Sequence, residues 1–537
     1  MIVAGVPTPS TLIDQAVRRA APGLPGLAGV TLPALVVERT ANPAHGDYSI
    51  TLPLKLAREL HRKPTEIAAE LAGRLSLPAG FADVEIAPPG FINLRLRPSR
   101  LQAQVEPIAG AGAGWGRSDL GHELPVQVEF VSSNPTGPLL FSHARGAVVG
   151  DVVARLLEAT GFAVQREYYV NDAGNQVRLF GESIQAAIGG QPAPEGGYRG
   201  AYVEEIARAA AAKLGKSATV QALAEFGIAA NLESIRRDLD RLRIAHHAWF
   251  SERSLYQGWD QDTLAKLRSL GRVVERDGAV WFVTGGDKDE VLYKRTGEPT
   301  YFAADIFYHR DKLEKRGYQR VVDIWGADHQ GQVNRLKQAL EVLGIDPARL
   351  TVILVQLVSV RRGPEIVRMS RRSGVGITLE EMLDEVGPDA VRYFFLLRSS
   401  DAHMEFDVDL AKQQSNENPV FYAQYAHARL SNVRKFGAAV QAAPAFERLD
   451  SEWELDLLRA VVRWPDVVRE AAESLEPHRL AFYANELAAR IHVFYKNVRV
   501  VVDDQPASAA RLRLSEAARV TLANALDLMG VSAPERM

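Results

Sequence analysis

The sequence predicts an α/β protein with a Rossmann-like parallel-sheet domain, preceded by an N-terminal α+β domain and followed by a C-terminal all-α helical bundle. Three observations support this prediction. Residues 116–385 alternate strand-like with helix-like segments, residues 386–537 show almost only helical periodicity, and residues 1–115 mix both patterns. The 537 residues are enough for about three or four domains of ordinary size.

The N-terminal domain, residues 1–115, combines both kinds of element. Apolar residues at helical spacing predict a helix over residues 64–75. The segment VEIAPPGFINLRL predicts two short strands on either side of a Pro-Pro-Gly turn. No pattern in this domain indicates catalysis.

The middle domain, residues 116–385, begins with a strand–helix–strand unit. Residues 126–132 predict a strand, residues 146–160 a helix with an apolar stripe of period near 3.6, and FAVQREYYV the next strand. Such units build parallel sheets covered by helices. The pattern returns at residues 321–329 and in the apolar strand TVILVQLVSV, and residues 175–290 between the halves are predicted to be a helical, polar insertion.

The C-terminal domain, residues 386–537, is predicted to be a helical bundle. It is rich in Ala, Arg and Leu, and it closes with a well-patterned helix over residues 515–528 and the tail GVSAPERM.

Composition excludes several classes of site. The absence of cysteine excludes disulfides, thiolate catalysis and Cys-type zinc sites, and no metal-ligand motif is evident. No apolar run approaches the ~20 residues of a membrane span, and the N-terminus lacks a secretory pattern. We therefore expect a cytoplasmic protein without a membrane partner. The net charge of −3 argues weakly against an RNA partner but does not exclude one.

The turn after the first middle strand, residues 132–146, is one candidate for binding phosphate. It lies at the carboxyl end of a predicted parallel strand and opens a helix, where free backbone N–H groups can bind an anion. His143 in this turn could donate a hydrogen bond to a phosphate. A Pro/Gly connection with an incidental histidine is about as plausible from these residues alone.

The segment RMSRRSG, residues 368–374, is a second candidate. Its arginines, with small neighbours, suit a loop that clamps phosphates while charge develops. A solvated basic loop is the commoner meaning of such a charge run.

Together, these two segments resemble the ATP motifs of class I aminoacyl-tRNA synthetases, HIGH and KMSKS. Longer segments are similar to the arginine-specific family: EFVSSNPTGP, YYVNDAGNQV, TYFAADIFYHRDKL, VDIWGADHQGQVNRLKQAL, ENPVFYAQYAHARL and GVSAPERM. NPAHGDYSITLPLKLA and PGFINLRL resemble that family's additional N-terminal domain. These matches occur in the family's order over most of the chain.

The ATP motifs depart from the family pattern. The first reads Leu140-Phe141-Ser142-His143, so a leucine that cannot donate replaces the first histidine and a serine replaces the glycine. In the second, Arg368 and Arg371 replace both lysines, which keeps the charge but exchanges a compact ammonium for a planar fork.

The resemblance implies three sets of site residues in the middle domain. The carboxylate of Asp305 also suits a guanidinium, which presents five N–H donors. A structural role remains the alternative for each residue taken singly, and Gln332 is a weaker candidate. The implied arginine-binding set is Glu129, Ser132, Asn134, Tyr301 and Asp305; the ATP-binding set is Gly137, His143, Gly326, Asp328, His329 and Met369; the catalytic set is Ser142, His143, Arg368, Ser370 and Arg371.

The C-terminal domain resembles the family's anticodon-binding domain from Asp389-Ala390-Val391-Arg392 onward. Tyr422, Tyr425 and Arg429 are candidates for binding tRNA, because aromatic rings stack on unpaired bases and arginine neutralises phosphates. Aromatic residues on a helix are more often part of a core.

The resemblance implies ATP-dependent ligation of L-arginine to its cognate tRNA through an arginyl-adenylate, for protein synthesis. ATP would be a substrate accompanied by Mg²⁺, and we expect a monomer. One alternative is a synthetase-like paralogue that binds RNA or arginine without charging tRNA, for which the altered first motif is the argument. The other is an unrelated Rossmann-type nucleotide enzyme, which the lack of G-x-G-x-x-G and P-loop motifs disfavours.

Overall fold

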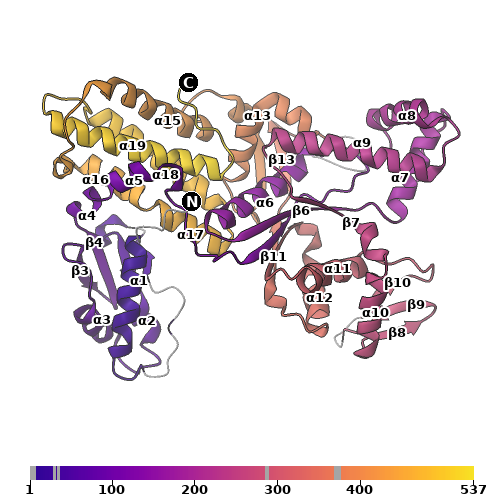
Figure 1. Ribbon diagram of the computed structural model, residues 1–537, viewed down its shortest axis with the longest axis horizontal. Helices are drawn as coiled ribbons and strands as arrows, with labels where there is room; N and C mark the ends of the chain where they lie inside the picture. Colours follow the sequence, from indigo (N-terminus) through magenta and orange to yellow (C-terminus); the bar gives the residue numbers. More distant parts are fainter. Residues whose placement is uncertain (1–7, 28–31, 33–36, 41, 285–288, 368–375) are drawn as a thin grey trace.

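The computed structural model describes residues 8–27, 32, 37–40, 42–284, 289–367 and 376–537 (Figure 1). It confirms the predicted fold class. In Figure 1 the N-terminal domain lies below the C-terminal bundle, and the parallel sheet extends away from both.

The N-terminal domain is a four-stranded antiparallel sheet with helices packed against it. The sheet order is β1-β2-β4-β3, and β3 and β4 flank the Pro-Pro-Gly turn as predicted. The predicted helix over residues 64–75 is α3, which buries Ile67, Ala68 and Leu71. The elements are α1 (Pro9–Ala20), β1 (Val37–Arg39), β2 (Tyr48–Ile50), α2 (Leu52–Leu56), α3 (Pro64–Arg74), β3 (Ala82–Ala87) and β4 (Phe91–Leu96). Two short helices, α4 (Pro98–Gln102) and α5 (Val105–Ala111), lead to the middle domain.

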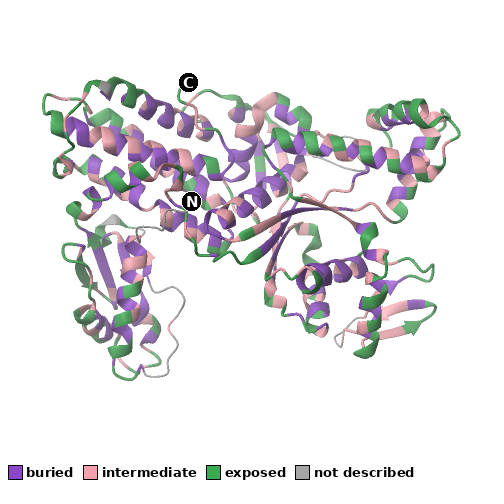
Figure 2. Ribbon diagram, in the orientation of Figure 1, coloured by how far each residue is buried: buried purple, intermediate pink, exposed green. Residues whose placement is uncertain are grey.

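The middle domain is built on a five-stranded parallel sheet of order β12-β11-β5-β6-β7. Numbered along the chain within this sheet, the order is 3-2-1-4-5 from the β7 edge, which is that of a doubly wound Rossmann sheet. Helix α6 (Phe141–Ala159) leaves β5 and packs into the core (Figure 2). The strands are β5 (Pro125–Glu129), β6 (Ala163–Val170), β7 (Ala248–Ser251), β11 (Arg320–Gly326) and β12 (Leu350–Val355).

The segment between residues 175 and 290 is only partly the helical insertion that we predicted. Three helices form it first and pack around their own apolar cluster: α7 (Asn175–Ile188), α8 (Ala201–Leu214) and α9 (Val220–Arg241). Strand β7 then joins the parallel sheet, and a small antiparallel sheet of order β10-β9-β8 follows α10 (Trp259–Ser269). Strands of four residues are too short to give a clear period-2 signal. They are β8 (Val273–Arg276), β9 (Ala279–Phe282) and β10 (Glu290–Tyr293).

Two further predictions about strands need correction. The predicted strand TVILVQLVSV is two strands, since β12 ends at Val355 and β13 (Val358–Arg362) belongs to another sheet. That sheet has the order β14-β13-β15, with β14 (Glu365–Val367) and β15 (Met404–Asp407). Strand β15 lies in the region that we predicted to be almost entirely helical, and it pairs there with the distant β13.

The remaining helices complete both domains. α11 (Tyr301–Arg310) and α12 (Gln330–Val342) flank β11, and α13 (Leu379–Phe395) is kinked at Gly387, whose φ is +77°. The C-terminal bundle shares a continuous apolar core with the middle domain. Its helices are α14 (Val408–Lys412), α15 (Pro419–Phe436), α16 (Glu452–Val462), α17 (Trp464–Ser474), α18 (His478–Asn497) and α19 (Gln505–Leu528).

Candidate active site

The sheet order places a candidate site at the carboxyl ends of β5 and β11. These neighbouring strands are where the order reverses, and ligands of doubly wound sheets bind outside the carboxyl ends at that point. Glu129 ends β5 and Gly326 ends β11. The sequence-predicted residues Glu129, Ser132, Asn134, Gly326, Asp328 and His329 thus belong to one edge of the sheet.

Helix α11 carries the two other residues of the predicted arginine-binding set. Thr300 caps this helix by accepting a hydrogen bond from the N–H of Ala303. Tyr301 and Asp305 lie one turn apart, as the four-residue spacing predicted. Tyr301 is 61% exposed and lines a pocket of about 360 Å³, together with Gln332 and Trp281. Tyr301 is therefore a surface residue rather than part of the core.

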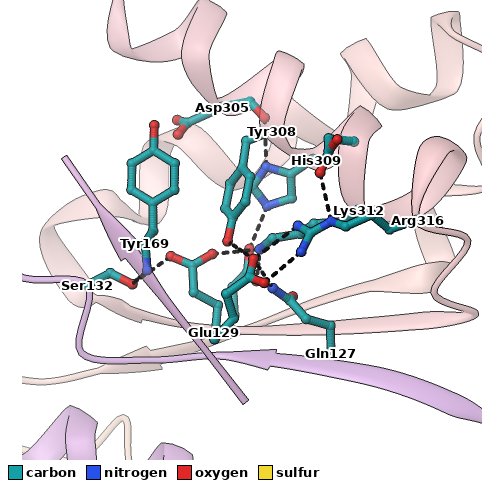
Figure 3. A network of polar contacts seen from close by, with 12 residues as sticks. Gln127, Glu129, Ser132, Tyr169, Asp305, Tyr308, His309, Lys312 and Arg316 are labelled. Carbon is teal, nitrogen blue, oxygen red and sulfur yellow. Dashed lines mark hydrogen bonds and ion pairs between the residues drawn. The ribbon is translucent and has the colours of Figure 1, made fainter. Parts of the chain in front are cut away.

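The carboxylate of Asp305 has no hydrogen bond or ion pair with any residue that the structure describes. Its link to His309 runs through the main-chain oxygen, 2.7 Å from His309 Nδ1 (Figure 3). Burial raises the pKa of Asp305 to about 7, and the negative charges of Glu129 and Asp323 act in the same direction, whereas His309 and His329 oppose it. A desolvated carboxylate without a counter-ion is a natural site for a cation.

A buried lysine joins the two strands beneath Asp305. Lys312 Nζ lies 2.6 Å from Glu129 Oε2 and 2.9 Å from Asp323 Oδ1, and its side chain is fully buried (Figure 3). His309 Nε2 contacts the other oxygen of Asp323 at 2.5 Å. Burial alone would lower the pKa of Lys312, but the carboxylates of Asp323 and Glu129 raise it. The ammonium therefore stays charged and fixes Glu129.

A second buried carboxylate, Glu167 on β6, extends this network. It accepts hydrogen bonds from Gln127 at 2.8 Å, from the Tyr308 hydroxyl at 2.6 Å and from Arg316 at 2.6 and 3.0 Å. Burial tends to raise the pKa of Glu167, and the hydrogen bonds and charge of Arg316 outweigh it, so the pKa is lowered. The hydrogen bonds of Glu167 with Tyr308 and Arg316 hold α11 and the residues after it against the sheet.

The sequence analysis named Glu129 and Asp305 but missed the residues that hold them in this network, Glu167, Tyr308, His309, Lys312, Arg316 and Asp323. They follow a detectable pattern, because Asp305, His309, Lys312 and Arg316 recur at intervals of three or four residues. A polar stripe on an otherwise apolar helix can indicate either a solvent-exposed face or a buried polar network.

The turn after β5 has an unusual backbone. Val131 and Ser132 have φ values of +72° and +39°, a region that side chains of L-residues rarely adopt. Ser132 Oγ donates to Glu129 at 2.8 Å and accepts from the N–H of Tyr169 at 3.1 Å. Asn134 Nδ2 donates to Gln176 Oε1 at 2.7 Å. The strained turn is thus tied to β6 and α7.

His143 and Leu140 have distinct structural roles at the start of α6. His143 Nδ1 accepts a hydrogen bond from the N–H of Leu140 at 3.1 Å, so the proton of a neutral ring lies on Nε2. Leu140 packs toward Gly376, where an added Cβ would lie 3.1 Å from Leu140 Cδ2. Ser142, in the first turn of α6, is half-buried. The leucine at the first motif position therefore makes an apolar contact.

The first motif lies beside the segment that follows the second. The N–H of Phe141 donates to Ile377 O at 2.9 Å, and the N–H of Leu379 donates to Leu139 O at 2.8 Å. Residues 376–379 follow the RMSRRSG segment in the sequence after one intervening residue. Four predicted residues of that segment lie outside the described residues: Arg368, Met369, Ser370 and Arg371.

Asp328 and His329 form the rim at the end of β11. Their side chains are exposed, and His329 Nδ1 lies 3.2 Å from Gln332 Oε1 at the start of α12. On the other side, Gly137 faces Tyr202 of α8, where an added Cβ would lie 3.5 Å from the hydroxyl.

The three candidate tRNA-binding residues cluster with two residues of α18. The Arg429 guanidinium lies 4.3 Å from the Tyr425 ring centroid and 5.0 Å from that of Tyr495. Tyr422 packs on His492 with ring centroids 4.4 Å apart, and His492 Nδ1 is 2.9 Å from Arg429. These rings are partly exposed, with Tyr495 46% exposed, so they form an accessible aromatic and basic surface.

The described residues contain neither a metal-binding cluster nor a membrane-spanning helix. No group of three or more His, Cys, Asp or Glu residues in the described parts of the chain could hold a metal ion. Among the same residues, no helix has the length and apolar character to cross a membrane.

Comparison with known proteins gives consistent matches along the chain. Three family models match: Arginyl tRNA synthetase N terminal domain at residues 10–96, tRNA synthetases class I (R), catalytic domain, at residues 113–189, and DALR anticodon binding domain at residues 423–537. Arginine–tRNA ligase of Moorella thermoacetica is 45% identical over 529 residues, covering 94% of both chains. The same enzyme of Bacillus subtilis is 42% identical, over 94% of this chain and 95% of that one.

Solved structures agree in fold. Thermus thermophilus arginyl-tRNA synthetase matches with a TM-score of 0.78 at 23% identity, covering 97% of this chain and 99% of that one. Plasmodium falciparum arginyl-tRNA synthetase matches with a TM-score of 0.73 at 17% identity, covering 98% of both chains.

Proposed function

Because this chain belongs to the arginyl-tRNA synthetase family, we infer that it uses ATP to join L-arginine to its cognate tRNA. The observation that carries this function is the 42–45% identity to arginine–tRNA ligases over nearly the whole chain. The enzyme is a class I ligase, and arginyl-adenylate is its intermediate. The non-charging paralogue is not supported, since these matches extend through all three family models.

The arginine side chain binds at Asp305 in this proposal. The desolvated carboxylate lacks a partner among the described residues, and a guanidinium would supply both charge and paired N–H donors. Tyr301, one turn earlier on α11, would cover the same side chain. Glu129, held by Lys312 and Ser132, would accept from the α-amino group, with Asn134 next to it. These contacts would direct the arginine carboxylate toward ATP.

The ATP phosphates are proposed to bind over the start of α6. The positive end of the α6 helix dipole and the imidazole of His143 favour negative charge there. Gly137 and Ser142 would lie along the phosphates, and Gly326, Asp328 and His329 near the ribose and adenine. We assign Arg368, Met369, Ser370 and Arg371 to the same site from the family motif.

In the first step, an oxygen of the arginine carboxylate attacks the α-phosphorus and pyrophosphate leaves with the bond electrons. In the second, a ribose hydroxyl at the 3′ end of tRNA attacks the arginyl carbonyl and AMP leaves. Positive groups act on charge that develops in the first transition state. Mg²⁺ would be carried on the ATP phosphates.

The other two domains are proposed to bind tRNA. Residues 1–115 would contact the tRNA body, and residues 386–537 the anticodon stem-loop. The rings of Tyr422 and Tyr425 would stack on bases, and Arg429 would contact phosphate. We further propose that the enzyme acts as a monomer in the cytoplasm without a membrane partner.

Arginine transfer to bulk tRNA tests the function and its specificity. We expect charging with arginine and at least a hundredfold lower kcat/KM for lysine, ornithine and citrulline. Citrulline has nearly the shape of arginine but no charge, so it would leave Asp305 without a counter-ion. Equal charging with citrulline would contradict the Asp305 assignment, whereas no charging with any amino acid would contradict the function.

Arginine affinity should depend on pH through Asp305. The carboxylate binds the guanidinium only when ionised, and its pKa is raised to about 7 in the free protein. The dissociation constant should therefore fall about tenfold between pH 6 and pH 8, since affinity is lost as pH drops below that pKa. Isothermal titration with arginine measures this change.

The Asp305→Asn variant is the control for this titration. It should bind arginine weakly and lose most of the pH dependence. A slope in the variant equal to that of the wild type would assign the pH dependence elsewhere.

A further inference from the structure

The helical insertion α7–α9 forms hydrogen bonds with the turn that connects β5 with α6. Each of its three helices contributes one side chain to one residue of this turn. Gln176 of α7 accepts from Asn134, as described above; Asn231 of α9 donates to Pro135 O at 3.0 Å; the Tyr202 hydroxyl of α8 donates to Thr136 O at 3.0 Å. Three successive turn residues are thus held by helices that start 41 to 86 residues later in the sequence than Asn134.

These contacts are built into the fold. Asn231 is 4% exposed, and a buried side-chain amide is costly without a partner. Burial also raises the pKa of Tyr202, so that its hydroxyl remains a donor. A further donor, the Tyr168 hydroxyl of β6, binds Ser133 O at 2.7 Å from the sheet side. The carbonyls of Ser133, Pro135 and Thr136 therefore all have fixed partners.

The insertion is packed tightly enough to act as one body. Its helices enclose an apolar cluster that includes Phe180, Ile184 and Leu223. Two glycines allow close approach: a Cβ on Gly181 would lie 2.4 Å from Val220 O, and one on Gly227 would lie 2.6 Å from Ile184 Cδ1. A rigid three-helix unit can fix the position of the turn that it contacts.

The turn needs such support. Val131 and Ser132, at its start, have left-handed backbone angles that persist only where the surroundings hold them. The turn then separates two proposed subsites, with Asn134 toward arginine and Gly137 toward ATP.

We propose that the insertion α7–α9 is a positioning element for the active site, with Tyr202 and Asn231 fixing the ATP side of the turn and Gln176 fixing its arginine side. The inference rests on the proposed role of this turn in binding ATP and arginine. Its three side chains act through the turn and are positioning residues rather than catalytic ones.

Steady-state aminoacylation by the full-length enzyme, with saturating tRNA, tests this division. Tyr202→Phe and Asn231→Ala should each raise the KM for ATP about fivefold to tenfold, as expected for the loss of one buried hydrogen bond. Both should leave the KM for arginine within about twofold. Gln176→Ala should instead raise the KM for arginine about fivefold to tenfold and leave the KM for ATP within about twofold. A simple loss of folded protein would lower the apparent kcat and change neither KM.

Two matched controls lose the same kind of hydrogen bond elsewhere. Tyr483→Phe removes a tyrosine hydroxyl bond to Ala460 O of 2.9 Å, and Asn524→Ala removes amide bonds to Gly112 O and Trp115 O of 2.9 Å each. Both should keep the wild-type KM values. Equal KM changes in these controls would overturn the proposal, because the effect would then not depend on contact with the turn.

His143→Ala separates this inference from the proposed function. If His143→Ala impairs ATP use while Tyr202→Phe and Asn231→Ala keep wild-type KM values for ATP, the positioning role is wrong and the ATP site stands. If the wild-type enzyme fails to charge tRNA with arginine, the proposed function itself is wrong, and the inference falls with it.

Discussion

Replacing Asp305 with alanine is expected to lower kcat/KM for arginine about a hundredfold or more, equivalent to ~2.7 kcal/mol of transition-state stabilisation. The reason is the position of this carboxylate: it is desolvated, its pKa is raised to about 7, and it has no ion pair with any described residue. Binding a guanidinium there supplies the missing counter-ion. Steady-state charging of tRNA at varied arginine concentration measures the loss.

Two companion variants sharpen this result. Asp305→Asn keeps the shape and removes the charge, so it should lose nearly as much as alanine. Glu341→Ala removes an exposed carboxylate on α12 and should stay within about twofold of the wild type. Wild-type kcat/KM in Asp305→Ala would show that another group binds the guanidinium.

Lys312→Met should lower the free energy of unfolding by about 3–5 kcal/mol, the usual cost of removing one partner from a buried ion pair. Lys312 is fully buried and is the cation shared by Glu129 and Asp323. The variant would leave these two carboxylates close together without that cation, and Asp323 would keep only its contact with His309. Urea denaturation followed by circular dichroism measures the change.

Lys266→Met is the matched control for this variant. Its partner Glu314 is at the surface, at 2.9 Å, and exposed pairs contribute at most about 1 kcal/mol. Lys312→Met combined with Asp323→Asn should recover part of the lost stability, because one of the stranded charges is removed. A loss for Lys312→Met no larger than that of the control would mean that the network does not depend on this ammonium.

The fold and part of the site could be predicted because their signals are local. Periodic apolar residues predicted α3, α6 and the strands β5 and β6, and the four-residue spacing placed Tyr301 and Asp305 on one face of α11. The turn after β5 was predicted from its place between a strand and a helix. The ligand roles of these residues stay predictions until the variants are measured.

The sequence by itself predicted the order of domains, the resemblance to the arginyl-tRNA synthetases and the candidate site residues. The tertiary structure decided which distant residues form ion pairs and hydrogen bonds with each other. Lys312 and Glu129 are 183 residues apart in the sequence, and Asn231 and Pro135 are 96 apart, so no local pattern could have paired them. It also decided that β7 joins the parallel sheet and that β15 pairs with β13. Periodicity reports which face of an element is apolar, whereas the partner of a buried charge or a short strand depends on how distant segments pack.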